Sequence, residues 1–485
     1  MSPSLSIVEG TAFQQLWSSN SILPMRTTQG YHVGYAWVKE EQAGNGYKIY
    51  SYDVAEHPYH FDNNPWFKGN TYNYESQGRR YSYPVYPSPI DLERGNLLSE
   101  EQYNSGDKLV MSTRTTYESP TDVVIMKASK VELLKAPLAE PVWYVGYTHY
   151  PILTSSNRIK TTTVNTNYDS NGENPSHLIT TYDYNGQGHL QATSVTKTLD
   201  DIEYVDNVIF PPDYGAISSA TSGIKLLQQK NLINVPIETY TIRRATGQGK
   251  GSVINGTLTQ FKTDTPLPDA VYSLKVSKPL AEDNFHKSNR IAGSFEPDAS
   301  YEKQVAYYEY DRVGNVRELS KYKDIHIAYL WGYSNSKPIA EIKNATVSQV
   351  FHTSFEDQAT NFSDSALTGA KSWKGIYLLK PPGPGNFKAT YWRRTSGPSW
   401  ELVETNISGP TQVGEVDGLI DEVRIFPPDA LITTYTYEIG VGISTSNDAR
   451  NIVNRYYYDA LGRLTCVKDH SGHVLKTFTY HYKNQ

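Results

Sequence analysis

The chain has 485 residues and a formal net charge of -6, and 38% of its residues are hydrophobic. This acidic balance gives no general attraction to nucleic acid or to an anionic membrane surface, and no run reaches the roughly 18 apolar residues of a membrane-spanning helix. The one cysteine, Cys466, excludes internal disulfides and cysteine-rich zinc sites.

Tyrosine dominates the aromatic residues, with 39 Tyr against 13 Phe and 8 Trp. Such rings suit half-buried sheets, in which the ring packs and the hydroxyl stays paired or hydrated, whereas disordered chains are poor in aromatic residues. We therefore expect an all-β protein. Its length allows two or three domains, or one repeat body with an insertion.

Strand signals begin near residue 30. Residues 30–41 and 46–54 alternate well enough for strands, with an Ala-Gly-Asn-Gly turn between them, which predicts a hairpin. A proline-punctuated connection follows, and then a second hairpin with its turn at 104–107.

Two segments are helix candidates. Residues 129–140 could be helical up to Pro137, and residues 218–232 are the better candidate because their apolar residues recur at helical spacing. Residues 234–244 read as a strand. The glycine-rich residues 247–256 read as a surface turn, and they have no phosphate-binding character because they lie between strands.

The pattern changes near Val347, where five strand-like runs joined by Gly- and Pro-rich loops predict a compact antiparallel sandwich. These runs are residues 350–357, 372–380, 387–394, 400–406 and 418–427. After residue 428 the Tyr-rich pattern returns. We therefore predict a repeat body, residues 1–346 and 428–485, that is interrupted by a guest domain, residues 347–427, whose two ends lie close together.

One motif recurs in the repeat body: Tyr-x-Tyr-Asp, two free positions, then Gly and a polar residue. Tyr at i and i+2 lie on one face of a strand, the Asp or Asn can start a turn, and the Gly can adopt the positive φ that closes a hairpin. The motif therefore predicts a repeated strand-turn-strand unit with stacked rings, and no single motif residue looks catalytic. The motif residues are Tyr72, Tyr74, Gly78, Tyr168, Asp169, Gly172, Tyr182, Tyr184, Asn185, Gly188, Tyr308, Tyr310, Asp311, Gly314, Tyr456, Tyr458, Asp459 and Gly462.

These YD motifs resemble those of RHS/YD-repeat proteins. YLWGYSNSKPIAEIKNA and the ending YYYDALGRLTCVKDHSGHVLKTFTYHY are similar to the C-terminal part of large RHS-like proteins of Bacteroidetes. The resemblance implies a β-strip that spirals into a partial or complete shell, which in relatives encloses a C-terminal toxin or, in teneurin-like proteins, serves cell adhesion. It also implies a secreted or cell-surface location, although the start MSPSLSIVEG does not read as a secretory signal.

The self-cleavage motif of the toxin-bearing relatives, of DPxGL type, does not occur in this sequence. We therefore expect no caged toxin in this chain. The degenerate spacing of the repeats favours a partial spiral over a closed shell.

The guest domain resembles a jelly roll of the carbohydrate-binding-module type. The resemblance implies a structural calcium held by Glu356 and Asp421, with Asp357 as a further candidate; exposed carboxylates beside strands are the alternative. Sugar rings stack on exposed aromatic side chains, but a small jelly roll also needs rings for its own core, and adjacent Tyr391 and Trp392 must point to opposite faces. The candidate sugar-binding rings are Trp373, Tyr377, Tyr391, Trp392 and Trp400.

No catalytic constellation is found. Two loop histidine pairs lack a third metal ligand, and two pairs of adjacent acids would face opposite ways on strands, so they cannot form a glycosidase pair by themselves. These pairs are His57 and His60, His470 and His473, Asp200 and Asp201, and Asp421 and Glu422.

The sequence therefore favours a non-enzymatic, secreted or surface-displayed β scaffold whose insert binds a glycan or a protein. One alternative is the shell part of an RHS-type toxin or effector system, and another is a polysaccharide-processing enzyme with a carbohydrate-binding insert. No cofactor other than the calcium, no nucleic-acid partner and no membrane insertion are expected, and the oligomeric state stays open.

Overall fold

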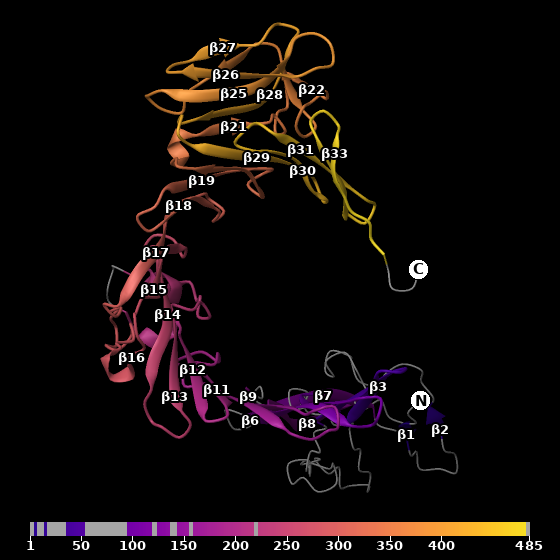
Figure 1. The fold of residues 1–485 in the computed structure, drawn as a ribbon. Helices are drawn as coiled ribbons and strands as arrows, with labels where there is room; N and C mark the ends of the chain where they lie inside the picture. The colour runs from indigo at the N-terminus through magenta and orange to yellow at the C-terminus, as the bar shows by residue number, and fades with distance from the viewer. Residues whose placement is uncertain are drawn as a thin grey trace. The chain divides into compact units, whose positions relative to one another are not determined.

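The computed structural model describes residues 4–6, 14–16, 35–53, 95–118, 124–135, 143–154, 159–217 and 222–481. The chain divides into two compact units (Figure 1). The first comprises residues 1–186, 190–208 and 241–253, and the second comprises residues 187–189, 209–240 and 254–485. Regular structure is almost entirely antiparallel β, so the predicted all-β class is confirmed. None of the described helices is long and apolar enough to cross a membrane.

The first unit is an antiparallel meander, in which each strand pairs with the next strand of the sheet. Its strands are β3 (Trp37–Gln42), β4 (Gly46–Tyr52), β5 (Leu97–Tyr103), β6 (Leu109–Glu118), β9 (Ile159–Asn167), β10 (Ser176–Asp183), β11 (Ser194–Leu199) and β12 (Ile202–Ile209). Two separate hairpins are β1 (Ser4–Ser6) with β2 (Gln14–Leu16), and β7 (Val124–Lys135) with β8 (Trp143–Thr154).

Strand β7 shows that the helix predicted for residues 129–140 is wrong, since its described part is strand as far as Lys135. The alternation of Lys130, Val131, Glu132 and Leu133 has the period of a strand, and this outweighs the short apolar cluster that suggested a helix. The predicted hairpin around residues 43–46 is confirmed as β3 and β4.

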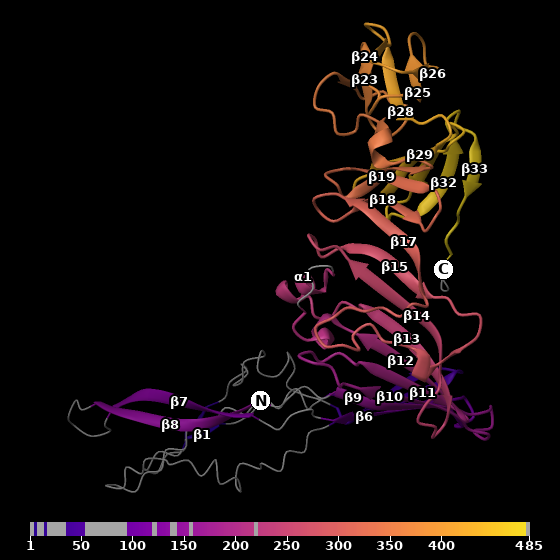
Figure 2. The same cartoon turned by 90° about the vertical axis from the view of Figure 1, so that its left-hand side faces the viewer.

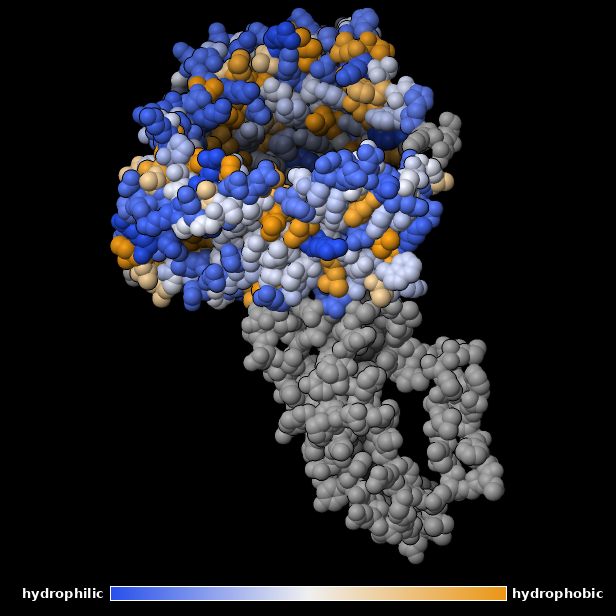
Figure 3. Space-filling view, turned by 60° about the horizontal axis from the view of Figure 1, so that its bottom comes forward, coloured by the Kyte–Doolittle hydropathy of each residue, from blue (hydrophilic) through white to orange (hydrophobic). Residues whose placement is uncertain are grey.

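In the first unit, strands β3–β6 and β9–β11 bury no apolar side chain; the side chains buried there are polar, such as Thr163 and Thr180. Threonines face each other across neighbouring strands, as Thr163 does with Thr115 and with Thr180. Cross-strand pairs and backbone hydrogen bonds therefore hold a sheet of one layer, with both faces only half-buried. On the face shown in Figure 3, described apolar side chains are scattered among polar ones.

The second unit contains a longer meander, which we call the strip. Beyond β13 (Glu238–Ala245) it runs through β14 (Ser252–Phe261), β15 (Pro268–Leu274), β17 (Tyr301–Tyr310), β18 (Val316–Lys321), β19 (His326–Gly332), β20 (Lys337–Lys343), β29 (Leu431–Glu438), β30 (Gly442–Asn447), β31 (Val453–Tyr458), β32 (Leu464–Asp469) and β33 (Val474–Thr477). Short elements are β16 (Leu280–Ala281), η3 (Pro211–Tyr214), η4 (Glu282–Asn284) and η5 (Val347–Gln349).

The helix predicted within residues 218–232 is present but short, since α1 comprises Ile224–Gln229. Ile224 and Leu227 are buried against Tyr214 and Phe261, so tertiary packing holds this single turn and a half. The predicted glycine-rich turn is also shorter than expected, because β14 begins at Ser252 within it.

Residues 344–430 leave the strip between β20 and β29, which pair directly with Lys343 opposite Leu431; we call this segment the insert. Its main sheet has the order β22 (Phe362–Ser363), β23 (Ser372–Lys374), β28 (Leu419–Phe426), β25 (Phe387–Arg394) and β26 (Glu401–Ile407), and β21 (Phe351–Thr353) also pairs with β28. A small sheet joins β24 (Tyr377–Leu379) to β27 (Thr411–Val413). Figure 2 shows these strands gathered beside β29. The exact domain limits stay a prediction.

One turn closes six described hairpins. The Oδ1 atom of an Asp or Asn accepts hydrogen bonds from the backbone N–H groups of the residues two and four positions later. The residue three positions later has a positive φ. In one copy Asp311 Oδ1 accepts from Val313 and Asn315 at 2.9 Å each, and Gly314 has φ +96°. The turns begin at Asn104, Asp169, Asp311, Asp448, Asp459 and Asp469.

Three of these turns place the motif residues as the sequence predicts, with Gly172, Gly314 and Gly462 at the positive φ. The copy at Asn185 differs: its N–H donates to Thr193 Oγ1, and ten residues separate Asp183 from its partner Ser194, so no tight turn forms there. Gly188 still has φ +71°. Tyr72, Tyr74 and Gly78 lie outside the described residues.

The tyrosine next to the turn residue has a specific role. Its hydroxyl donates to a backbone carbonyl of the preceding strand: Tyr184 to Lys160, Tyr310 to Pro268 and Tyr458 to Ile443, at 2.7–2.8 Å. Each such bond fastens a hairpin end to its neighbour. In the copy that begins at Tyr168, the backbone N–H of Tyr168 donates to the carbonyl of Val110.

The predicted ladder of i, i+2 rings is wrong in the copy at Tyr308. Register shifts in β17 turn Tyr310 toward Tyr307, with ring centroids 6.0 Å apart, while Tyr308 stacks on His326. Tyr456 instead hydrogen-bonds Ser446, and Tyr182 lies beneath Lys160. In β17 and β31, a register shift before the turn therefore separates the two motif tyrosines.

Candidate functional site

The insert and the strip share an apolar core. Phe426 from β28, together with Val347 and Val350 around η5, packs on Ala340 and Ile342 of β20. All five side chains are at least 94% buried. The insert is therefore seated on the strip rather than attached by a free linker.

A buried polar network continues this junction around a bulge in β28. Trp392 pairs with Asp421 and Thr390 with Arg424, so two residues of β28 stand opposite one of β25, and Glu422 has φ +54°. As a result Ile420 and Val423 face the core of the insert, whereas both carboxylates face away from it. The expectation that these adjacent acids point to opposite faces is therefore wrong.

The network joins the insert to the returning strands. Thr368 Oγ1 lies 3.2 Å from both Asp421 Oδ1 and Glu422 Oε2, and Thr434 and Asn447, from β29 and β30, donate to Glu422. Arg424, 1% exposed, donates to Thr390 and to the carbonyl of Asp448. These hydrogen bonds connect the insert to strands β29 and β30 and to the turn at Asp448.

The two predicted calcium ligands are used in hydrogen bonds. Asp421 accepts from the N–H groups of Leu367, Thr368 and Glu422, and burial raises the pKa of its carboxyl well above the usual value. Glu356 accepts from the N–H groups of Ala370 and Lys371, and burial raises its pKa too.

Both acids therefore anchor the loop 367–371. The described residues contain no group of three or more His, Cys, Asp or Glu side chains that could hold a metal. N–H groups occupy both oxygens of Asp421 but only Oε1 of Glu356, so calcium binding by this pair stays a prediction.

The candidate sugar-binding rings mostly pack. Tyr391 and Trp392 are 5% and 6% exposed, on opposite faces of β25 as predicted: Tyr391 lies in the core of the insert, and Trp392 packs beside Val453 and His470. Such rings have no free face for a sugar, so these two serve packing.

The other three rings are half-buried. Trp373 and Tyr377 pack against Phe355 in the insert core, and Trp400 packs at its other face with Arg394 over its ring at 5.2 Å. Ligand stacking by these three stays a prediction.

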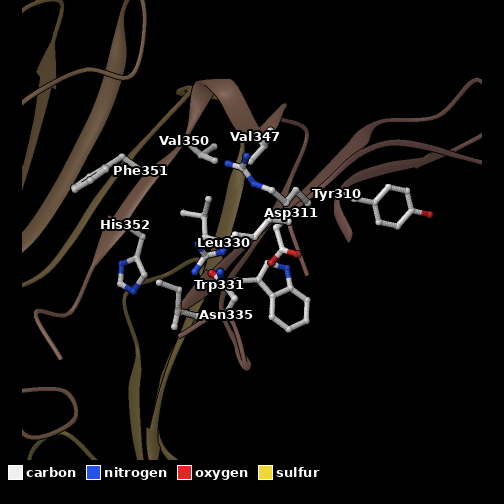
Figure 4. A pocket seen from close by; sticks show the side chains of 12 residues that line it. Tyr310, Asp311, Leu330, Trp331, Asn335, Val347, Val350, Phe351 and His352 are labelled. Carbon is white, nitrogen blue, oxygen red and sulfur yellow. The ribbon is translucent and has the colours of Figure 1, made fainter. Parts of the chain in front are cut away.

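A pocket of about 620 Å³ opens where the strip meets the start of the insert (Figure 4). Its apolar lining consists of Leu330, Trp331, Ile339, Val347, Val350 and Phe351. Its other lining residues are Tyr310, Asp311, Arg312, Arg317, Asn335 and His352. The ring of Tyr310 points away from the space, in line with its bond to Pro268.

The pocket combines two arginines with one carboxylate. Arg317 is paired with Glu309, while Arg312 is exposed and has no ion-pair partner among the described residues. The Asp311 carboxylate is bound within its own turn by Val313 and Asn315. Burial, the largest single effect, raises its pKa, but the hydrogen bonds of the turn together lower it.

His352 connects the pocket with the network. It is 6% exposed, its Nδ1 contacts the carbonyl of Val423, and its Nε2 has no partner. Burial lowers the pKa of this imidazole, so it is neutral in the folded protein. It also stands opposite Arg424 in the strand register.

Sequence reasoning missed Arg312, Arg317, Trp331 and His352. Arg312 lies within a turn motif that reads as structural and Arg317 follows it, and no local spacing joins them to His352, which comes from the insert. Only the topology brings these residues together.

The remaining predicted pairs form no site. His473 contacts Asp469 within its turn, His470 packs on Trp392, and Asp200 occupies the β11–β12 turn with φ +53°. His57 and His60 lie outside the described residues.

Comparisons with known proteins give distant structural similarity. No sequence profile of a protein family matches, and no curated protein matches. A solved structure titled "Crystal Structure of TcdB2-TccC3-TEV" is similar over 90% of this chain and 20% of that chain, with 9% identity and a TM-score of 0.40. "Crystal Structure of TcdB2-TccC3" is similar over 90% and 29%, with 9% identity and a TM-score of 0.34. This chain thus spans about a fifth to a third of the length of those chains.

Proposed function

We propose that this chain is a non-enzymatic β scaffold of the RHS/YD-repeat kind, which presents its insert to a glycan or protein ligand outside the cell or at its surface. One observation carries the proposal: the insert shares a core and a buried network with the strip, through Phe426 and Glu422. A module seated in this way keeps one orientation, as a display scaffold requires.

Binding is favoured over hydrolysis. A glycosidase needs two carboxylates, about 5–10 Å apart, on either side of the bond to be cleaved. Asp421 and Glu422 both reach Thr368, but they are 0% and 1% exposed and cannot contact a polysaccharide. Among the described residues that line the pocket, Asp311 is the single carboxylate.

A second candidate is the wall of an RHS-type shell in a toxin or effector system. It is favoured by the single-layer sheet of the first unit, in which strands β3–β6 and β9–β11 bury no apolar side chain. A sheet with two half-buried faces gains stability when further protein covers one of them. A wall that encloses a cargo would provide this cover.

The test compares the whole chain with a variant in which residues 344–430 are replaced by Asn-Gly, a turn that suits the direct pairing of β20 with β29. Both proteins are screened on glycan arrays and on arrays of extracellular proteins, after circular dichroism has shown that both keep their β structure. The scaffold proposal expects ligands of the whole chain that the variant does not bind. A whole chain without any ligand, or a variant that keeps every ligand, refutes it.

A further inference from the structure

We propose that the pocket between the strip and the start of the insert binds the C-terminal carboxylate of a polypeptide whose last residue is apolar. This inference rests on the proposed role in ligand binding, and it names the site and the chemical group that the site recognises. This site differs from the sugar-binding site predicted from the sequence, because none of the candidate aromatic rings lines this pocket.

The volume and floor of the pocket suit one large apolar side chain with its adjoining backbone. About 620 Å³ lies within the usual range of ligand sites. The floor is formed by Leu330 and Ile339 of the strip and by Val350 and Phe351 of the insert. Figure 4 shows Leu330 and Val350 beside this space.

The charges at the rim select an anion. Arg312 has no ion-pair partner among the described residues, and Arg317 is 38% exposed although it is paired with Glu309. The Asp311 carboxylate is held within its turn by three hydrogen bonds. The exposed guanidinium of Arg312 is therefore free to pair with an anionic ligand. A guanidinium matches the planar geometry of a carboxylate.

The neutral polar groups fit a peptide group. The side-chain amide of Asn335 has no hydrogen bond to the described residues, so it can both donate to and accept from a backbone amide. His352 lines the same pocket, and its Nε2 is buried without a partner. A ligand with both N–H and C=O groups next to its carboxylate would satisfy these atoms.

Two other acids fit less well. The hydroxyl groups of a uronic-acid sugar would lie against the apolar floor, where they would lose their hydration without gaining hydrogen bonds. A fatty acid would fill the floor but leave Asn335 and His352 Nε2 without partners. The combination of apolar floor, polar amide and guanidinium rim therefore favours a peptide C-terminus.

The experiment measures binding of dye-labelled hexapeptides to the whole chain by fluorescence anisotropy. The probes have randomised first residues, end in Leu, Phe or Val, and carry either a free carboxylate or a C-terminal amide. Octanoate and an oligogalacturonate serve as competitors. We expect the free acids to bind and the amides to bind at least about tenfold more weakly.

The test variant is Arg312→Ala. The equivalent position in the Asp459 turn is Ala460, so the substitution is compatible with the turn. The matched control is Arg450→Ala, which removes an exposed arginine from another turn outside the pocket. We expect Arg312→Ala to weaken binding of the free acids at least about tenfold and Arg450→Ala to leave it unchanged.

Three results would overturn the inference: equal binding of acid and amide, normal binding by Arg312→Ala, or no peptide binding up to about 1 mM. Binding of octanoate or oligogalacturonate alone, if sensitive to Arg312→Ala, would assign the pocket to another acid and overturn it as well. The scaffold proposal fails separately, when the whole chain binds no ligand at all or when the variant without the insert keeps every ligand. An array ligand that requires the insert but tolerates Arg312→Ala leaves the scaffold proposal standing and refutes only the peptide site.

Discussion

Phe426→Ala tests whether the insert and the strip form one cooperative structure. The ring is 6% exposed and packs against Ala328, Ala340 and Ile342 of the strip. Removing about 150 Å² of buried apolar surface at ~25 cal/mol per Å² costs about 4 kcal/mol, within the 3–5 kcal/mol that large-to-small aromatic substitutions usually cost. We expect the free energy of unfolding to fall by about this amount.

The assay combines urea denaturation with amide hydrogen exchange of β20. Because Phe426 belongs to the insert while Ala340 and Ile342 lie on β20, a shared core requires that the substitution speed up exchange in β20. Phe362→Ala is the control, since that ring is 38% exposed. Unchanged exchange in β20, with faster exchange confined to the insert, would show that the insert is an independent module.

Three further predictions concern turns and pH. Gly314→Ala, at φ +96°, should lower stability by about 1–2 kcal/mol in thermal melts, whereas the exposed Gly249→Ala, without a positive φ, should not. The lowered pKa of Asp311 adds stability at pH values above its unfolded-state pKa of about 3.9, and this stability is lost as pH falls through the folded-state pKa. Asp311→Asn reproduces the turn residue Asn104, so in acid titrations it should keep the turn and reduce this loss. Burial lowers the pKa of His352 from 6.5, so the stability that its neutral form contributes is present above pH 6.5 and is lost as pH falls below it. His352→Gln should flatten the stability curve below pH 6.5, and an unchanged curve would refute the assignment.

The hairpin unit was predictable because its determinants are local. The turn from Asp311 to Asn315 needs one acceptor side chain and one residue with positive φ, and both are visible in the sequence. The same chemistry also closes the turn at Asp448, where Asn451 replaces glycine with φ +64°. The motif does not find that copy because it requires Tyr-x-Tyr before the turn and glycine at the positive φ, and this copy has neither.

The ring ladder and the junction were not predictable by the same reasoning. Strand alternation assumes a regular pleat, and one extra residue reverses the face of every side chain beyond it. The register shifts at Tyr310 and near Glu422 are such additions, and neither position carries a glycine or proline to announce it. The pocket combines Arg312 with His352, 40 positions apart, and only tertiary contacts join them.

The bulge at Glu422 explains how the insert keeps one position on the strip. In a regular strand, one of the two adjacent acids would enter the apolar core that contains Val423, where an unpaired carboxylate costs several kcal/mol. The positive φ of Glu422 instead turns both acids outward, and donors from β29 and β30 meet Glu422. Since His352 stands opposite Arg424 in the same register, this network also sets the wall of the pocket. The geometry of the proposed peptide site therefore depends on a buried polar junction and not on a hinge.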